Sequence, residues 1–336
     1  MTQEKIATYF EALTTSTQAL AQDADISMID ALIEVLEDIH AGNIQHELDM
    51  PTAETTDKIQ NLITDFDWQH MTQADLRKVL QLVILKANRD DKTPTNYQLT
   101  PDGIGYLLAD FLSQTANLSD GDTIIDITVG TGNLLNTIND VLIMNNVKIK
   151  RIGIDNDDTQ LALASAVDEL LNQGTTEFYQ EDVISTKDVP KSKAVIADLP
   201  VGYYPIQPGD DYDTRATEGR SFVHHLLIEK SLEFVTEDGW VYLIVPANIL
   251  NGDNAKNLLK LVANKAQLKA FLQLPNEFFK DQRAAKAILV LQKKDVGTKT
   301  EVLMGQYPTL KDIAALKKFL QEIAAWVKLD KEQDSI

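Results

Sequence analysis

The chain has 336 residues, with 31 Lys and Arg against 51 Asp and Glu, a formal net charge of −20 and no Cys. Its length predicts about two domains, and its 44% hydrophobic and 24% charged residues exclude collagen-like, coiled-coil and wholly disordered chains. Without Cys there is no disulfide framework, thiolate nucleophile or Cys-ligated zinc. The five His form no HExxH pattern, so we expect no metal site.

The first residues of the chain do not resemble a signal peptide. Residues 1–13 include Glu4, Lys5 and Glu11, where a signal peptide needs an unbroken apolar core. The sequence also has no run of about 18 apolar residues that could span a membrane. We therefore expect a cytoplasmic protein.

Residues 1–92 are predicted to form an acidic, all-helical domain. Apolar residues recur at helical spacing in three segments, 6–20, 29–39 and 59–66. The pair Thr72 and Asp75 is typical of the first turn of a fourth helix. Positions 1–96 hold 17 acidic and 7 basic residues, which disfavours a nucleic-acid-binding face there.

After the polar run 88–94, the pattern changes to short β-branched or apolar segments that alternate with helical ones. This alternation predicts an α/β fold, in which a mainly parallel, Rossmann-like sheet is covered by helices on both faces. The predicted strands are 123–127, 151–154, 177–180, 194–196, 240–245, 268–273 and 287–291. Only 13 residues separate the last two, so we expect an antiparallel pair at one edge of the sheet.

We assign residues 93–295 to this second domain and residues 296–336 to a C-terminal helical extension. The extension contains one amphipathic pattern, from Ile313 to Trp326. We expect this helix to pack on the sheet edge or on the helical domain.

The strand at 123–127 leads into Gly130 and Gly132 and then into a helix. Such glycines let the backbone approach a ligand and direct the first N–H groups of the helix toward it. A dinucleotide fold needs Gly or Ala at position 135, where this chain has Leu135. Asp126 would also repel a pyrophosphate, but it could pair with an ammonium group. The alternative interpretation is a tight turn with packing glycines.

Asp155 and Asp182 follow the next two predicted strands. Asp155 comes 25 residues after Gly130, the place of the acidic residue that binds ribose hydroxyls in nucleoside-binding sheets. Asp182 could accept a hydrogen bond from an exocyclic amino group. One such carboxylate is more often a helix cap, but three at consecutive strand ends, with Asp126, indicate a nucleoside site.

These residues resemble the class I S-adenosylmethionine-dependent methyltransferases, and among them the N6-adenine methylases of DNA. Over about residues 96–294 the chain is similar to the modification subunit of type I restriction systems and its stand-alone relatives. In that family a Thr-Pro segment helps to hold the amino-acid end of the cofactor, and the stretch from Tyr97 to Gly105 matches it. Segments 274–279 and 287–292 look like the edge hairpin of the family. The chain departs from the family at Ile127 and Thr128, where Pro and often Ala are usual.

The resemblance implies S-adenosylmethionine as the cofactor. The residues that it implies for cofactor binding are Tyr97, Thr100, Pro101, Asp126, Gly130, Gly132, Asn133, Leu134, Asp155, Asn156, Asp182 and Val183.

The fourth predicted strand ends in Asp198, Leu199 and Pro200, where we expect the chemistry. The exocyclic nitrogen of adenine is a poor nucleophile, because its lone pair is delocalised into the ring. A side-chain acceptor and a backbone carbonyl that draw on its two N–H bonds concentrate electron density on that nitrogen. Asp198 and the carbonyl of Leu199 could do this, with Pro200 fixing the turn.

The catalytic segment departs from the family pattern at two positions. Leu199 stands where a first proline is usual, and Val201 stands where an aromatic ring normally stacks on the flipped base. We expect Tyr203 or Tyr204 to replace that ring. The alternative is a Pro/Gly/Tyr turn that only caps the strand.

The sequence thus predicts a methyltransferase that acts on an amino nitrogen, with adenine N6 in DNA as the target that the resemblance implies. Cytosine C5 methylation is excluded because it needs a Cys nucleophile. The alternatives are methylation of a protein glutamine amide, or a catalytically weak cofactor-binding scaffold or regulatory subunit whose acidic domain docks a basic partner.

The charge of the chain also bears on its substrate. Residues 203–220 carry four acidic and two basic side chains beside the expected target entrance. We expect weak binding to duplex DNA by the chain alone. Methylation of DNA would then need a basic partner, a recognition subunit such as type I systems have, or a single-stranded substrate.

Overall fold

The computed structural model describes residues 3–44, 51–97, 99–188, 190–251, 255–279, 281–293 and 301–333. The chain divides into two compact units. Unit 1 contains Met1–Leu99, Gly130–Asn133 and Asp157–Gln180, and unit 2 contains Thr100–Val129, Leu134–Asn156 and Glu181–Ile336. The helix and strand within 157–180 thus belong to the helical unit, which the pattern of residues 1–92 did not indicate.

Unit 1 is built on four helices of the N-terminal segment and one helix from later in the chain. These are α1 (Gln3–Ala24), α2 (Met28–Ala41), α3 (Ala53–Thr64), α4 (Gln73–Asp90) and α7 (Asp158–Asn172), followed by strand β3 (Thr176–Gln180). The capping pair is confirmed, because Thr72 Oγ1 accepts from the Asp75 amide and donates to the Asp75 carboxylate. The buried apolar faces of these helices form one core, which includes Leu13, Val35 and Leu163.

The strands form one eight-stranded sheet in the order β3-β2-β1-β4-β5-β7-β6-β8. Those of unit 2 are β1 (Thr123–Asp126), β2 (Lys150–Asp155), β4 (Ser192–Asp198), β5 (Val235–Pro246), β6 (Gln267–Gln273), β7 (Lys286–Gln292) and β8 (Leu303–Gln306). Strands β2, β1, β4 and β5 are parallel neighbours. The predicted mainly parallel α/β sheet is confirmed.

The antiparallel pairing of β6 with β7 is also confirmed, but its predicted place at the sheet edge is wrong. Strand β7 lies between β5 and β6, and β8 pairs with the other side of β6. The sequence did not reveal β8, because a four-residue strand that alternates between half-buried and exposed positions is too short to give a clear period.

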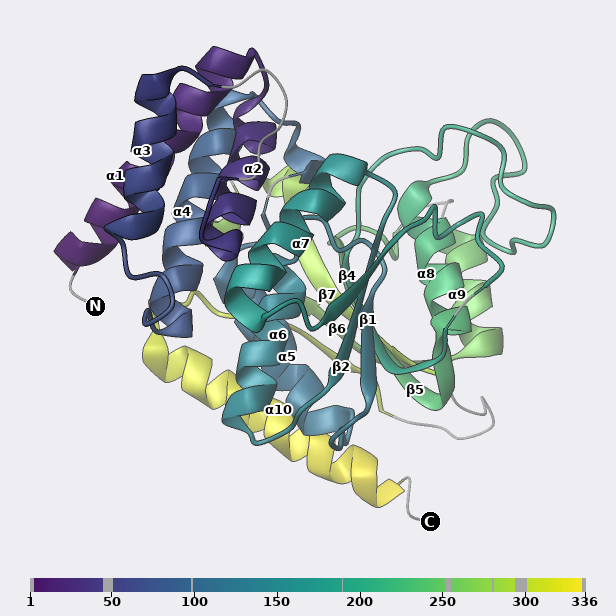
Figure 1. Cartoon of the computed structure of the whole chain (residues 1–336). Helices are drawn as coiled ribbons and strands as arrows, with labels where there is room; N and C mark the ends of the chain where they lie inside the picture. The colour runs from purple at the N-terminus through teal and green to yellow at the C-terminus, as the bar shows by residue number, and fades with distance from the viewer. Residues whose placement is uncertain are drawn as a thin grey trace. The chain divides into compact units, whose positions relative to one another are not determined.

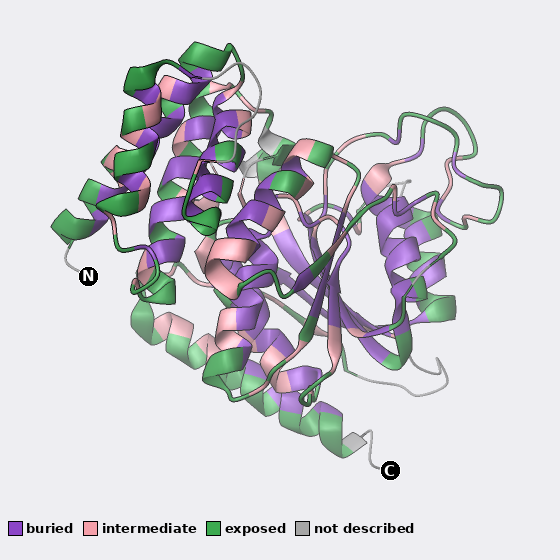
Figure 2. Cartoon of the chain, viewed as in Figure 1, coloured by how far each residue is buried: buried purple, intermediate pink, exposed green. Residues whose placement is uncertain are grey.

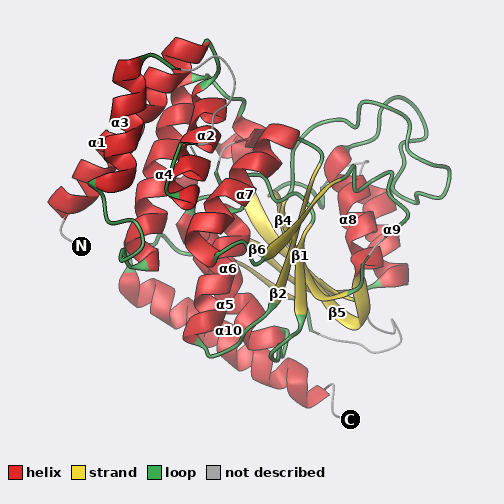
Figure 3. Ribbon diagram, viewed as in Figure 1, coloured by secondary structure: helices red, strands yellow, loops and turns green. Residues whose placement is uncertain are grey.

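Helices cover both faces of the unit 2 sheet, and Figure 3 shows α8 (Val223–Phe234) and α9 (Ala255–Lys265) on one of them. Successive side chains of β5 point to opposite faces of the sheet. Val241 and Leu243 lie on one face, in a core shared with residues of α8 and α9. Tyr242, on the opposite face, contacts Phe111 of α5 (Asp102–Thr115), and its hydroxyl lies 2.6 Å from Thr115 Oγ1. Helix α6 (Asn133–Met144) packs closely on α5, where the Cβ of any residue replacing Gly105 would lie 2.9 Å from Thr137.

The C-terminal helix α10 (Ile313–Gln333) packs on α5 and the sheet of unit 2 (Figure 1). The Trp326 ring lies 5.8 Å from that of Phe111. Lys269 of β6, which is fully buried, forms an ion pair of 2.7 Å with Asp330, which is 5% exposed. Figure 2 shows the inward faces of the helices buried and their outer faces exposed. No helix among the described residues combines the length and apolar character needed to cross a bilayer.

Candidate active site

The carboxyl ends of the parallel strands of unit 2 meet at one edge, and three aspartates end strands there. Asp126 ends β1 and pairs in register with Gly153 of β2 and Ile196 of β4, so Asp155 and Asp198 lie just beyond it on the neighbouring strands. This is the edge at which open α/β sheets bind ligands. The structure therefore brings Asp126 and Asp155, which the sequence assigned to the cofactor, to the same edge as Asp198, the predicted catalytic residue.

Asp126 is 1% exposed, and its carboxyl accepts a hydrogen bond from the Thr128 amide at 3.1 Å. Burial, helped by the negative charges of Asp155 and Asp198 and opposed by the hydrogen bond from the Thr128 amide, raises the pKa of Asp126 to about 8. The carboxyl is therefore mostly protonated at pH 7 in the free protein. A cationic ligand group would favour its ionised form, so this residue fits the ammonium group of an amino-acid moiety.

The glycine turn after β1 has the backbone conformation that the sequence suggested. Gly130 has φ of 50° and Gly132 has φ of 76°, values that disfavour residues with a Cβ. Asn133, which follows, is 6% exposed, and its side-chain oxygen accepts from Arg77 at 3.1 Å and from Gln81 at 2.9 Å. Arg77 also donates to the Asn133 carbonyl. Sequence reasoning missed this contribution of α4.

The other residues of the predicted cofactor set differ in their exposure. Tyr97 lies in a short 3-10 helix of unit 1 (Thr95–Tyr97) and is 40% exposed. Leu134 and Val183 are buried, and Asn156 is exposed.

Asp182 is held in place by two donors within unit 2. Its carboxylate accepts from the Ile184 amide at 3.0 Å and from the hydroxyl of Tyr204. Tyr204 is 5% exposed, and burial together with Asp182 raises the pKa of its hydroxyl. Tyr204 therefore anchors Asp182, and its ring is turned into the core rather than toward a substrate.

The turn after β4 presents Asp198 with both carboxylate oxygens engaged. Oδ2 accepts from Thr100 Oγ1 at 3.0 Å, and Oδ1 forms an ion pair with Lys286. The Leu199 amide donates to the Ile244 carbonyl at 3.0 Å and so extends the β4–β5 pairing into the turn. Thr100, which the sequence placed with the cofactor, thus contacts the candidate catalytic carboxylate. Pro101, next to it, precedes the first turn of α5.

Lys286 is a further residue of this site that the sequence did not reveal. It is the first residue of β7, which runs antiparallel to β5, and it pairs in register with Pro246 at the end of β5. An antiparallel strand begins at the edge where its parallel neighbours end. The signal was therefore present, because a strand predicted as antiparallel brings its first residue to the ligand-binding edge.

Of the two tyrosines considered for stacking, only Tyr203 presents its ring to solvent. It is 60% exposed, and its ring stacks on Phe222 with centroids 4.7 Å apart and planes 21° apart. Val201 is 46% exposed beside it in the chain. Of the two rings, that of Tyr203 is therefore the accessible one.

Comparisons with known proteins agree with this architecture. The model of the YtxK N-terminal helical domain matches residues 7–87, and that of the N-6 DNA methylase family matches residues 83–328. Uncharacterized protein YtxK of Bacillus subtilis (strain 168) is 31% identical over 98% of this chain and 100% of its own length.

Two solved structures share the fold. One is described as a class I S-adenosylmethionine-dependent methyltransferase of Listeria monocytogenes, which is 28% identical with a TM-score of 0.86 over 97% of this chain and all of its own. The other is the methyltransferase subunit of a type I restriction-modification system of Streptococcus thermophilus. It is 14% identical, with a TM-score of 0.63 over 94% of this chain and 74% of its own.

The sheet order and these matches define a class I S-adenosylmethionine-dependent methyltransferase preceded by a helical domain, with S-adenosylmethionine as its cofactor. Within that class, the chain belongs to the N-6 DNA methylase family.

Proposed function

We propose that this methyltransferase acts on an amino nitrogen, and that its target is N6 of adenine in DNA. The observation that carries the proposal is the fixed carboxylate of Asp198 at the end of β4, followed by a turn through Leu199 and Pro200. A carboxylate and a backbone carbonyl on adjacent residues can accept the two N–H bonds of one amino group. These acceptors stabilise the positive charge that develops on nitrogen as it attacks a methyl group.

The cofactor residues of this proposal are those that the sequence predicted. S-adenosylmethionine supplies an electrophilic methyl group on a sulfonium centre. In the proposal, Asp126 with Thr100 and Pro101 binds the amino-acid end, and the backbone at Gly130 and Gly132 admits the cofactor closely. The adjacent strand ends bind the nucleoside, through Asp155 and Asn156 at the ribose and Asp182 and Val183 at the adenine. Tyr97, Asn133 and Leu134 complete the set.

Lys286 is a positioning residue in this proposal. Its ammonium group pairs with Asp198 Oδ1, and this contact helps to fix the position of the carboxylate as a hydrogen-bond acceptor. Thr100 fixes the second oxygen. A fixed acceptor needs little reorganisation when the amino group binds, and this lowers the barrier to transfer.

The test is transfer of a radiolabelled methyl group to single-stranded DNA, duplex DNA, RNA and cell-extract protein. Asp198→Ala should lower the turnover rate by on the order of a hundredfold while its affinity for S-adenosylmethionine, measured by calorimetry, stays nearly unchanged. Asp57→Ala, at an exposed position of α3, is the matched control and should transfer at the wild-type rate.

The alternatives give different outcomes. Transfer to protein alone would favour the glutamine amide as the acceptor. Cofactor binding with no acceptor in any pool would favour the scaffold or regulatory subunit. Equal activity in Asp198→Ala would place the chemistry elsewhere.

We also propose that the chain binds duplex DNA weakly without a basic partner or recognition subunit. Its net charge of −20 opposes the phosphate contacts that dominate duplex affinity. A mobility-shift series at ~0.15 M salt should show no sequence-specific duplex complex, and such a complex with the purified chain would overturn this point.

A further inference from the structure

A cavity opens in unit 2, between the loop that follows β4 and the first turn of α9. Its volume is about 720 Å³, within the range of small-molecule sites. Its lining comes from the turn at Tyr203, from residues 214–220, from Phe222 and His225 at the start of α8, and from Lys256 and Asn257. The cofactor and catalytic residues named above do not line it, with the exception of Tyr203.

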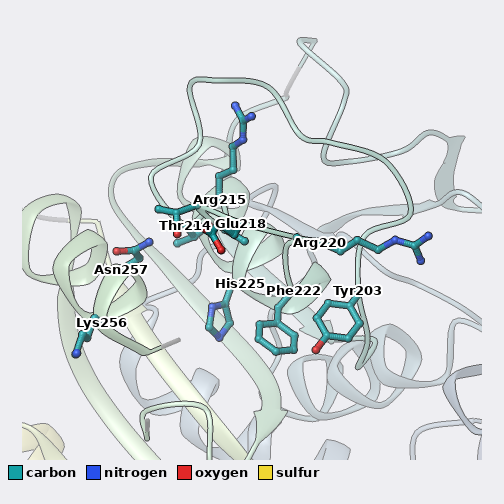
Figure 4. Close-up of a pocket in the computed structure, with 12 residues that line it drawn as sticks. Tyr203, Thr214, Arg215, Glu218, Arg220, Phe222, His225, Lys256 and Asn257 are labelled. Carbon is teal, nitrogen blue, oxygen red and sulfur yellow. The ribbon is translucent and has the colours of Figure 1, made fainter. Parts of the chain in front are cut away.

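One side of the cavity is a set of flat rings. The Tyr203 ring stacks on Phe222, and the His225 ring lies 5.4 Å from that of Phe222 (Figure 4). His225 is 5% exposed, and burial lowers the pKa of its imidazole. These residues therefore offer an uncharged aromatic surface, of the kind on which bases stack irrespective of sequence.

The rim of the cavity is cationic in a chain that is otherwise strongly acidic. Arg215, Arg220 and Lys256 line it against the single carboxylate of Glu218. Figure 4 shows the side chains of Arg215 and Arg220 extending outward from the loop. Arg215 also forms an ion pair with Asp210, which does not line the cavity.

The acidic residues of this loop are mostly directed elsewhere, which the charge count along the sequence did not show. Asp213 pairs with Lys265 of α9 at 2.9 Å. Asp210 and Asp211 are also absent from the cavity lining. The sequence predicted an acidic surface at residues 203–220. The structure instead places the basic residues of this loop in the cavity lining and leaves Asp210, Asp211 and Asp213 outside it.

The loop is anchored, so the cavity is preformed. Glu229 of α8 is 5% exposed, and its carboxylate accepts from the amides of Asp213 and Thr214 and from the Thr214 hydroxyl. At the other end of the loop, the Ala216 amide donates to Ser221 Oγ at 3.0 Å. A preformed site loses less conformational entropy when it binds a ligand.

We propose that this cavity binds one nucleotide of a single-stranded nucleic acid, its base on the ring of Tyr203 and its phosphate at Arg220. The proposal rests on the proposed function, because it names the form in which the target base arrives. Tyr203 is five residues from Asp198, a span of at most about 18 Å, so the bound nucleotide would lie near the target on the same strand. Tyr203 then stacks on this nucleotide rather than on the flipped target base. A base already paired and stacked in a duplex cannot reach Tyr203 without being unstacked.

The experiment is fluorescence anisotropy with a labelled single-stranded oligodeoxynucleotide and the corresponding duplex, over a salt series. The full chain should bind the single strand more tightly than the duplex. Tyr203→Ala should weaken single-strand binding by about tenfold or more, because one stacked base is lost. Arg220→Gln should weaken it and reduce the slope of log K against log salt by about 0.7, the contribution of one phosphate.

Arg89→Gln is the matched control, since it removes one positive charge from an exposed arginine of α4. It should leave both affinity and slope near the wild-type values. Circular dichroism and binding of S-adenosylmethionine should be unchanged in Tyr203→Ala, which excludes a folding defect as the cause. Equal single-strand affinity in wild type, Tyr203→Ala and Arg220→Gln would overturn the proposal, as would a preference for acidic peptide over the oligonucleotide.

Failure of this inference can be told apart from failure of the proposed function. Asp198→Ala should keep single-strand affinity but lose transfer, whereas the cavity variants should lose affinity. Transfer to DNA at equal KM in wild type and both cavity variants would overturn the cavity site and leave the enzyme intact. Single-strand binding that depends on Tyr203, without transfer to any acceptor, would support the cavity and contradict the methyltransfer proposal.

Discussion

The two units differ most in how they use their positive charges. Unit 1 has 22 acidic and 7 basic residues, and unit 2 has 29 acidic and 24 basic residues. In unit 1, Arg77 is buried against Asn133, and Lys58 pairs with Glu54 along its own helix. In unit 2, Lys286 holds the candidate catalytic carboxylate and Arg220 lines a cavity. In so acidic a protein, the position of each cation is a better guide to its role than the net charge.

The largest effect should come from a unit 2 cation that has a structural role. Lys269→Met removes the partner of Asp330 in a pair that is almost fully buried, and this leaves an uncompensated buried carboxylate. Breaking such a pair costs about 3–5 kcal/mol of the free energy of unfolding. We expect the Tm of the protein to fall by about 10 °C, measured by circular dichroism.

The double variant Lys269→Met with Asp330→Leu tests the cause. It removes both charges and should regain much of the lost stability, because apolar groups can replace a buried pair. If the double variant were no more stable than Lys269→Met, the loss would reflect packing against Trp240, over whose ring Lys269 lies, rather than an unpaired charge.

The next effect concerns the buried cation of unit 1. Arg77→Met removes two hydrogen bonds to Asn133, and charged hydrogen bonds of this kind contribute about 1.5–3 kcal/mol. We expect the free energy of unfolding, measured by urea denaturation, to fall by about 2 kcal/mol. We also expect weaker S-adenosylmethionine binding in calorimetry, because the residue after the glycine turn loses its anchor.

Arg89→Met, on the exposed side of the same helix, is the control and should change neither measurement. A wild-type cofactor affinity in Arg77→Met would show that Asn133 keeps its place through Gln81 alone. The role of α4 would then be limited to stability.

The sequence predicted well those elements that are determined by residues close together in the chain. Thr72 and Asp75, which are three positions apart, predict the start of a helix. Runs of β-branched residues predict most of the strands. The strand-end aspartates could be brought together because parallel strands end at one edge. Strand β8 was not predicted, because four residues are too few to show a clear alternation of apolar and polar side chains.

The parts that could not be predicted depend on contacts between distant residues. Arg77 and Asn133 are 56 positions apart, and Asp198 and Lys286 are 88 apart. No local pattern marks such pairs. The role of Tyr204 could not be predicted for the same reason. Its aromatic ring suggested stacking on a base, but its hydroxyl donates a hydrogen bond to Asp182. The number of acidic residues at positions 203–220 likewise gave no sign of the cationic cavity, because a count along the sequence does not say where each side chain points.

The last effect depends on pH and concerns the carboxyl group at the centre of the unit 2 edge. The pKa of Asp126 is raised to about 8 from its usual 3.8, so the folded protein keeps a proton that the unfolded chain has lost at neutral pH. The contribution of this group to stability therefore falls as pH rises from about 4 to 8. Asp126→Asn should remove that dependence, as measured by denaturation at several pH values.

The same proton should be displaced when the cationic cofactor binds, since a positive group beside Asp126 favours the carboxylate. We expect the affinity for S-adenosylmethionine to rise up to about tenfold per pH unit between pH 6 and 8, and then to level off. Calorimetry at pH 7 in buffers of different ionisation enthalpy should show proton release. The amino group of the cofactor itself titrates near pH 8, so Asp126→Asn is the essential reference: only the difference between the two proteins belongs to Asp126. Equal proton release in both would show that this carboxyl does not meet the cation.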